Sequence, residues 1–186
     1  LISKGLVKKA KITANKNIES LAALITSETP LIGIEPSAIL TFRDEYPDLV
    51  EKQLLKHAQN IAANSFMIDE FISNEITRGN ITQESFTKET AMIVLHGHCH
   101  QKSLASTAPM VKMLSLPQNY KVEEIKSGCC GMAGAFGYEK EHYDISMKIG
   151  ELILFPEIRK TTAEIIIAAP GTSCRQQIKD GTGRIA

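Results

Sequence analysis

Apolar and polar positions fall into blocks along the chain that predict helices and strands in turn. Residues 1–27 place apolar side chains at three- and four-residue steps with Lys and Asn between them, which is the pattern of an amphipathic helix. The same periodicity predicts further helices over residues 47–58, 65–77, 101–114 and 139–155. Pro109 lies inside the predicted helix over residues 101–114 and predicts a break or a kink there.

Four short apolar runs predict β-strands, at residues 31–35, 92–96, 120–125 and 164–169. The third run alternates in part, as an edge strand does, whereas the fourth is apolar enough to be buried on both faces. Strands that alternate with helices favour parallel pairing with right-handed crossovers. The pattern therefore predicts an α/β fold: a parallel Rossmann-like sheet of four or five strands with flanking helices and an N-terminal helical segment over residues 1–30.

Composition narrows the class of protein. The 186 residues are 43% hydrophobic and 23% charged, which predicts a single globular domain over residues 1–186. Lys plus Arg and Asp plus Glu number 21 each, so there is no electrostatic basis for binding nucleic acid or an anionic membrane. No apolar run approaches the ~20 residues of a transmembrane helix. The chain begins without Met and ends abruptly, so we expect a cytoplasmic fragment of a larger protein.

The four cysteines each follow closely on a predicted strand. Cys99 follows the second strand, the adjacent pair Cys129 and Cys130 follows the third, and Cys174 follows the fourth. Because ligands bind at the carboxyl ends of the strands in an open α/β sheet, three strand ends would bring four thiols into one pocket. Nothing suggests export, so we expect reduced thiols with a metal or redox role.

The adjacent cysteines favour an iron–sulfur cluster over a single zinc ion. Neighbouring side chains diverge, so Cys129 and Cys130 can reach two irons of a cluster more easily than one small ion. Gly131 and Gly134 allow positive φ and a close backbone approach, and their amides could donate to cluster sulfurs. His98, beside Cys99, is the histidine that we expect to contact the cofactor.

Three longer strings carry a resemblance to a known family. They are residues 96–102 (HGHCHQK), 129–139 (CCGMAGAFGYE) and 169–178 (APGTSCRQQI). They resemble the cysteine-rich CCG domain that occurs in heterodisulfide reductase and in the iron–sulfur subunits of glycolate, lactate and glycerol-3-phosphate oxidoreductases. The resemblance is most specific to the C-terminal region of fused FAD-linked oxidases that act on D-2-hydroxy acids.

The resemblance implies a redox domain that ligates an iron–sulfur cluster of the 4Fe-4S type through Cys99, Cys129, Cys130 and Cys174. That cluster would pass electrons from a reduced flavin toward an acceptor. FAD-binding and ferredoxin-like domains are implied as partners within the same parent protein, with FAD bound outside this chain. The chain alone is then expected to lack full oxidoreductase activity. It would reach the inner face of a membrane only peripherally, through the parent complex.

The sequence departs from the family pattern at two positions. The last motif is often Cys-x-x-Cys, but position 177 is Gln177, and the early Pro-Ser turn often continues with Cys, but here it continues with Ala38. A four-cysteine cluster, or one that borrows a histidine, fits better than a five-cysteine, non-cubane cluster. We expect His96 and His100 to pack or to cap a helix.

Two other kinds of site remain open from the residues alone. One is a mononuclear zinc site, structural or hydrolytic, made by three cysteines and one histidine. The other is a metal-free redox switch, in which Cys99 or Cys174 forms a disulfide with one of the paired cysteines.

Overall fold

A computed structural model describes residues 1–186 and contains ten α-helices, five β-strands and four short 3₁₀ helices. The chain divides into two compact units, Leu1–Ile68 and Asp69–Ala186. The organisation of residues 1–186 as one domain stays a prediction. None of the helices combines the length and the apolar character needed to cross a membrane.

The first unit is mostly helical and contains a two-stranded parallel sheet. Its elements are η1 (Ile2–Lys4), α1 (Val7–Leu21), β1 (Leu31–Gly33), α2 (Pro36–Arg43), α3 (Glu45–Leu49), η2 (Lys52–Leu54), α4 (Leu55–Ala63) and β2 (Ser65–Met67). Strand β1 pairs with β2 so that Leu31 lies opposite Ser65. Ala38 lies in α2, where it is exposed.

The core of the first unit forms where α1 meets the following short helices. Ala14 and Ile18 of α1 are fully buried, and they pack with Tyr46, Ala58 and Ile61 of α3 and α4. These α1 positions lie four residues apart, as the helical period requires for one face. Leu6 and Ile12, which the periodicity also suggested, are exposed, so the buried face is narrower and built from smaller side chains than the sequence predicts.

The second unit contains the central sheet and all four cysteines. Its elements are α5 (Ile68–Thr77, beginning at the boundary), η3 (Gln83–Ser85), β3 (Ala91–Leu95), α6 (Cys99–Leu104), α7 (Ala108–Leu114), β4 (Tyr120–Glu124), η4 (Phe136–Tyr138), α8 (Tyr143–Leu152), α9 (Leu154–Arg159), β5 (Ile166–Ala168) and α10 (Thr172–Thr182). The predicted break at Pro109 is confirmed, because this proline stands in the first turn of α7 and separates it from α6.

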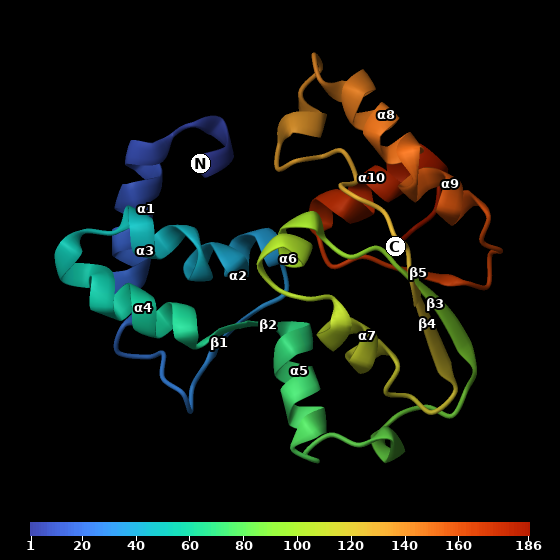
Figure 1. Ribbon diagram of the computed structural model, residues 1–186, viewed down its shortest axis with the longest axis horizontal. Coiled ribbons are helices and arrows are strands. Elements are labelled where there is room, and N and C mark those ends of the chain that lie inside the picture. The colour runs from blue at the N-terminus through green and yellow to red at the C-terminus, as the bar shows by residue number, and fades with distance from the viewer. The chain divides into compact units, whose positions relative to one another are not determined.

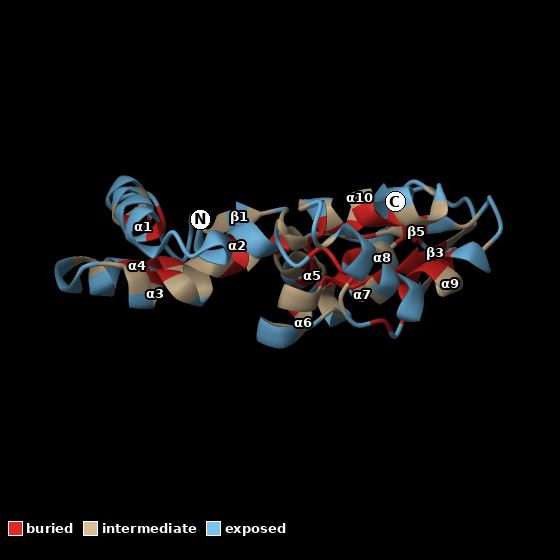
Figure 2. Ribbon diagram, turned by 90° about the horizontal axis from the view of Figure 1, so that it is seen from above, coloured by how far each residue is buried: buried red, intermediate tan, exposed pale blue.

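The five strands form two sheets and not the single sheet of four or five strands that the pattern predicted. In the second unit, the order is β4-β3-β5 and both pairs are parallel (Figure 1). β4 is an edge strand, as its alternation predicted. The expectation that the last run is buried on both faces is wrong, because β5 is the other edge and Ile166 is 47% exposed. The central, buried strand is β3, and buried residues gather along it and in α10 (Figure 2).

Helices α8, α9 and α10 pack together around the ring of Phe155, which is fully buried. Gly150 of α8 and Gly181 of α10 both lie against this ring, and a Cβ atom at either position would collide with it. The buried face of α8 therefore carries the small residues Ser146 and Gly150. The large apolar residues Tyr143 and Leu152 of α8 are exposed.

Candidate metal and redox site

The four cysteines lie in three segments that follow the carboxyl ends of β3, β4 and β5. Cys99 is the first residue of α6, Cys129 and Cys130 lie in the loop after β4, and Cys174 lies in the first turn of α10. Because the three strands are parallel, these segments leave the same edge of the sheet. The arrangement of strand ends that the sequence predicted is therefore present. We call Cys99, Cys129, Cys130 and Cys174 the thiol site.

Hydrogen bonds link the thiols in series. Cys129 bonds to both Cys99 and Cys130, and Cys130 also bonds to Cys174. Cys130 and Cys174 are buried, at 3% and 1% exposure, whereas Cys99 and Cys129 are partly exposed. No disulfide joins any of them. The thiol site thus has an inner pair and an outer pair, and its four sulfurs lie near one another and could bind a metal.

The pKa values of the four thiols are shifted in opposite directions. The hydrogen bond from Cys130, and then that from Cys99, holds the pKa of Cys129 well below its usual value. The bond from Cys130 also lowers the pKa of Cys174 to about 5, against burial, which raises it. The same bonds raise the pKa values of Cys99 and Cys130. The thiolate is the form that binds metal, and Cys130 has one S–H hydrogen, so it can stabilise a thiolate at Cys129 or at Cys174 but not at both at once.

The loop after Cys130 has an unusual backbone. Gly131, Ala133 and Gly134 have φ values of 103°, 40° and 71°, and Ala133 is the only non-glycine residue of the chain with positive φ. Such residues are costly, and they concentrate at functional sites. The amide of Gly131 donates to Sγ of Cys129 at 3.3 Å, which is the amide-to-sulfur contact expected of this glycine. Gly134 lies exposed in the same loop, and its contribution to a cofactor site stays a prediction.

Lys102 holds the backbone that leads into this loop. Its Nζ donates to the backbone carbonyl of Ser127 at 2.9 Å and lies 3.8 Å from a carboxylate oxygen of Glu124. Thr107 donates from its hydroxyl to the other oxygen of Glu124 at 2.7 Å. Helix α6, which begins at Cys99, is thereby tied through Lys102 to the segment that leads into Cys129.

Two histidines lie beside the inner pair of thiols. His98 is nearly buried, accepts the amide hydrogen of His100 at its Nδ1 and thereby caps α6. Its ring lies against Gly171, which is also next to Sγ of Cys174. His96 is completely buried, and its Nδ1 lies 2.8 Å from Oγ of Ser127. A ring nitrogen of His96 and the Sγ atoms of Cys130 and Cys174 lie within 4.8 Å of one another.

The sequence predicts only packing or capping for His96 and does not predict its position beside Cys130 and Cys174. The available signal was its position, because it directly follows β3, the most apolar of the strands. A histidine at the carboxyl end of a central strand points into the crevice that such sheets use for ligands. The prediction that His98 contacts a cofactor is not tested by its capping role and stays a prediction.

Gln177, at the position where the family pattern often has a cysteine, is used by the fold. Its side chain is 2% exposed, and its Nε2 donates to the carbonyl oxygen of Ser146 at 3.1 Å and to Oγ of Ser146 at 2.9 Å. Gly131 lies against the same carbonyl group, so this contact supports the loop of the paired cysteines. Ser146 thus joins α8, α10 and the cysteine loop.

The Gln177→Ala variant is expected to lose about 1–3 kcal/mol of stability, because it removes two buried hydrogen bonds, to the carbonyl oxygen and to Oγ of Ser146. Chemical denaturation of the metal-free protein measures this loss. The control is Gln176→Ala, which removes an exposed pair with Asp180 and should change stability by less than about 0.5 kcal/mol. Equal effects of the two substitutions would show that the contact with Ser146 does not support the loop.

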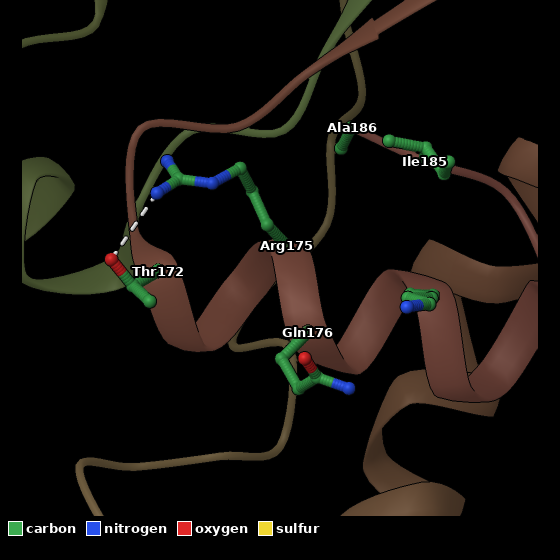
Figure 3. Close-up of a pocket in the computed structure, with 6 residues that line it drawn as sticks. Thr172, Arg175, Gln176, Ile185 and Ala186 are labelled. Carbon is green, nitrogen blue, oxygen red and sulfur yellow. Dashed lines mark hydrogen bonds between the residues drawn. The ribbon is translucent and has the colours of Figure 1, made fainter.

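Arg175, next to Cys174 in the sequence, stabilises the turn from β5 into α10. Its guanidinium donates to the carbonyl oxygens of Ala169 and Pro170 at 3.1 and 2.9 Å. It also donates to the hydroxyl of Thr172 at 3.2 Å (Figure 3). It lines a hollow of about 180 Å³, whose other residues are Thr172, Gln176, Lys179, Ile185 and Ala186. Because these bonds hold the turn from β5 into α10, Arg175 positions the segment that carries Cys174.

Comparisons with known proteins find similarity to several dehydrogenases. The chain is 29% identical over 183 residues to the D-2-hydroxyglutarate dehydrogenase of Pantoea ananatis, and the match covers 97% of this chain but 17% of that protein. The corresponding enzyme of Escherichia coli K12 is 27% identical with the same coverage. A subunit of the anaerobic glycerol-3-phosphate dehydrogenase of E. coli K12 is 26% identical over 186 residues, which is 98% of this chain and 44% of that polypeptide.

No family model and no solved structure matches the chain. The chain spans less than half the length of these curated relatives. It is therefore similar to one part of several larger oxidoreductases.

Proposed function

We propose that this chain is the iron–sulfur electron-transfer part of a FAD-linked 2-hydroxy-acid oxidoreductase. The observation that carries the proposal is the gathering of four thiols from three strand ends that are distant in sequence. A site assembled this way depends on the whole unit for its geometry, as a cofactor site does. The names of the relatives support a dehydrogenase that oxidises a hydroxyl group, with D-2-hydroxyglutarate as the substrate of two of them.

The donor set fits an iron–sulfur cluster. Cys99, Cys129, Cys130 and Cys174 would hold it, because iron–sulfur clusters take cysteine thiolates as ligands. Bound there, such a cluster supplies one-electron transfer between a flavin and an acceptor. The amide of Gly131 already donates to a sulfur, which is the kind of contact that tunes reduction potentials. The partly exposed outer pair, Cys99 and Cys129, gives the side from which a partner's electrons can enter.

The flavin and the substrate would be bound by other parts of a parent protein. The relatives are much longer than this chain, which supports FAD-binding and ferredoxin-like domains as its partners. The chain alone would then exchange electrons without oxidising a hydroxy acid. We expect it to act in the cytoplasm, reaching the inner face of a membrane only through such partners.

A mononuclear zinc site is the second candidate, and one observation favours it. His96, Cys130 and Cys174 already offer one nitrogen and two sulfurs within 4.8 Å of one another, which suits a tetrahedral ion with one further cysteine. Such a site would be structural or hydrolytic and would carry no electrons.

Metal and sulfide analysis of protein purified and reconstituted without oxygen separates the candidates. Roughly equal iron and acid-labile sulfide, with broad visible absorption that bleaches on reduction, is the expected result. Zinc without sulfide would favour the second candidate. Absence of any metal, with a reversible disulfide between an inner and an outer cysteine, would replace both with a thiol switch.

A further inference from the structure

The inner half of the thiol site contains a nitrogen atom for which neither packing nor the four-cysteine site accounts. His96 is completely buried, and its Nε2 has no well-formed hydrogen bond, its one polar neighbour being the thiol of Cys174. Buried polar atoms in folded proteins nearly always have partners, so each exception needs an explanation. The thiols of Cys130 and Cys174 lie with this imidazole inside a span of 4.8 Å, which is the spacing of ligands around one metal ion.

The other nitrogen of the ring is anchored. Nδ1 of His96 lies 2.8 Å from Oγ of Ser127, and the backbone of Ser127 is in turn held by Lys102. With the proton on Nδ1 donated to this hydroxyl, Nε2 keeps its lone pair available. Histidines that bind metals almost always donate their other ring N–H in this way, which fixes both the tautomer and the ring orientation.

Neighbouring side chains do not offer the same donor. Nδ1 of His98 is occupied by the amide of His100, and the amide group of Gln177 donates to Ser146. Nε2 of His98 faces Gly171, and the nitrogen that lies within 4.8 Å of both inner sulfurs belongs to His96.

We propose that Nε2 of His96 is a direct ligand of the iron–sulfur cluster together with Cys130 and Cys174, in place of one of the two outer thiols, so that the cluster keeps four protein ligands. This inference rests on the proposed function and adds a mixed nitrogen and sulfur donor set to it. A neutral imidazole leaves the bound cluster less negative than a thiolate in its place would. Histidine ligation raises cluster potentials for this reason, so the site would be a better electron acceptor than an all-cysteine one.

The test uses the complete chain, labelled with ¹⁵N-histidine and reconstituted anaerobically with ferrous iron and sulfide. Pulsed EPR of the reduced protein is expected to show the strong hyperfine coupling of a directly bound nitrogen. The coupling should disappear in His96→Ala. It should persist in His98→Asn, the matched control, because asparagine can also cap α6. Addition of ¹⁵N-imidazole to unlabelled His96→Ala should restore it, because the substitution leaves room for the ring.

The outcomes separate this inference from the proposed function. Iron and sulfide in the wild-type protein without a strongly coupled nitrogen would overturn the histidine ligand and leave the electron-transfer function standing. Loss of the coupling in His98→Asn, with its retention in His96→Ala, would assign the ligand to the other histidine and also overturn the inference. If the wild-type protein bound no iron, both proposals would fall. If His96→Ala fails to fold, the wild-type spectrum still shows whether a histidine nitrogen is bound, and the His98→Asn spectrum shows whether that nitrogen belongs to His98.

Discussion

Replacement of Gly131 by alanine is expected to destabilise the second unit by about 3 kcal/mol and to prevent cofactor assembly, because it combines backbone strain with a collision. Gly131 has a φ of 103°, a conformation that residues with a Cβ atom rarely adopt. The added Cβ would also collide with the carbonyl oxygen of Ser146, which is backbone and cannot turn aside. Denaturant unfolding of the metal-free protein measures the loss of stability.

Gly128→Ala is the matched control for this substitution. Gly128 lies on the other side of the paired cysteines, is exposed and has open space where a Cβ would stand. We expect its stability to lie within about 0.5 kcal/mol of the wild-type value and its iron content to be unchanged. If the two alanine variants behaved alike, the loop geometry described for Gly131 would be wrong.

Replacement of Cys130 by serine is expected to abolish stoichiometric binding of the iron–sulfur cluster. Cys130 is the inner sulfur that bonds to both Cys129 and Cys174, so its loss separates the two halves of the thiol site. Loss of groups that merely orient a ligand costs about 10–100-fold in metal affinity, and loss of the ligand itself should cost more. Iron and sulfide per chain after anaerobic reconstitution provide the measurement.

The same loss is expected for Cys174→Ser. In an all-cysteine site it is also expected for both Cys99→Ser and Cys129→Ser, whereas with His96 as a ligand one of these two variants should keep the cluster. Ser173→Ala, which changes the residue next to Cys174 but removes no thiol, should bind a full complement of iron. Intact binding in all four single Cys→Ser variants would refute the assignment of the ligands.

The part of the site that the sequence predicted depends on a topological rule. Three of the four runs that predict strands are followed by cysteine, and parallel strands bring their carboxyl ends to one edge whatever their order in the sheet. Neither the register of β3, β4 and β5 nor their order was needed to predict that Cys99 and Cys174 would meet. This is why the thiols were found although the sheet was predicted with the wrong number of strands.

The predictions of secondary structure and burial are wrong where the local sequence pattern does not distinguish a helix from a strand or a buried face from an exposed one. β2 has only three residues between two helices, so its apolar Phe66 and Met67 fitted a continuous helix as well as a strand. On α8 the buried face consists of Ser146 and Gly150, because the ring of Phe155 fills the space beside it. Hydrophobic periodicity cannot predict this buried face, because its residues are small and not hydrophobic.

His96 was misjudged for a different reason. The predicted strand runs to residue 96, but β3 ends at Leu95 and the chain turns into α6 at Cys99. Beyond the end of a strand, alternation no longer decides which side chain faces the sheet edge. Only the folded structure shows that Ser127 holds this imidazole against the inner thiols.

The pairing of β3 with β5 has a consequence for how the protein is made. Ile93 lies beside Ile166, so the central strand gains its second neighbour only after nearly the whole chain has been synthesised. Pairings between residues so distant in sequence raise the contact order and slow folding. Until α10 docks, Cys99, Cys129 and Cys130 belong to an incomplete sheet and lack Cys174. The newly made chain therefore passes through a period in which its thiols are open to oxidation, and we expect its yield in the reduced state to depend on the redox conditions during synthesis.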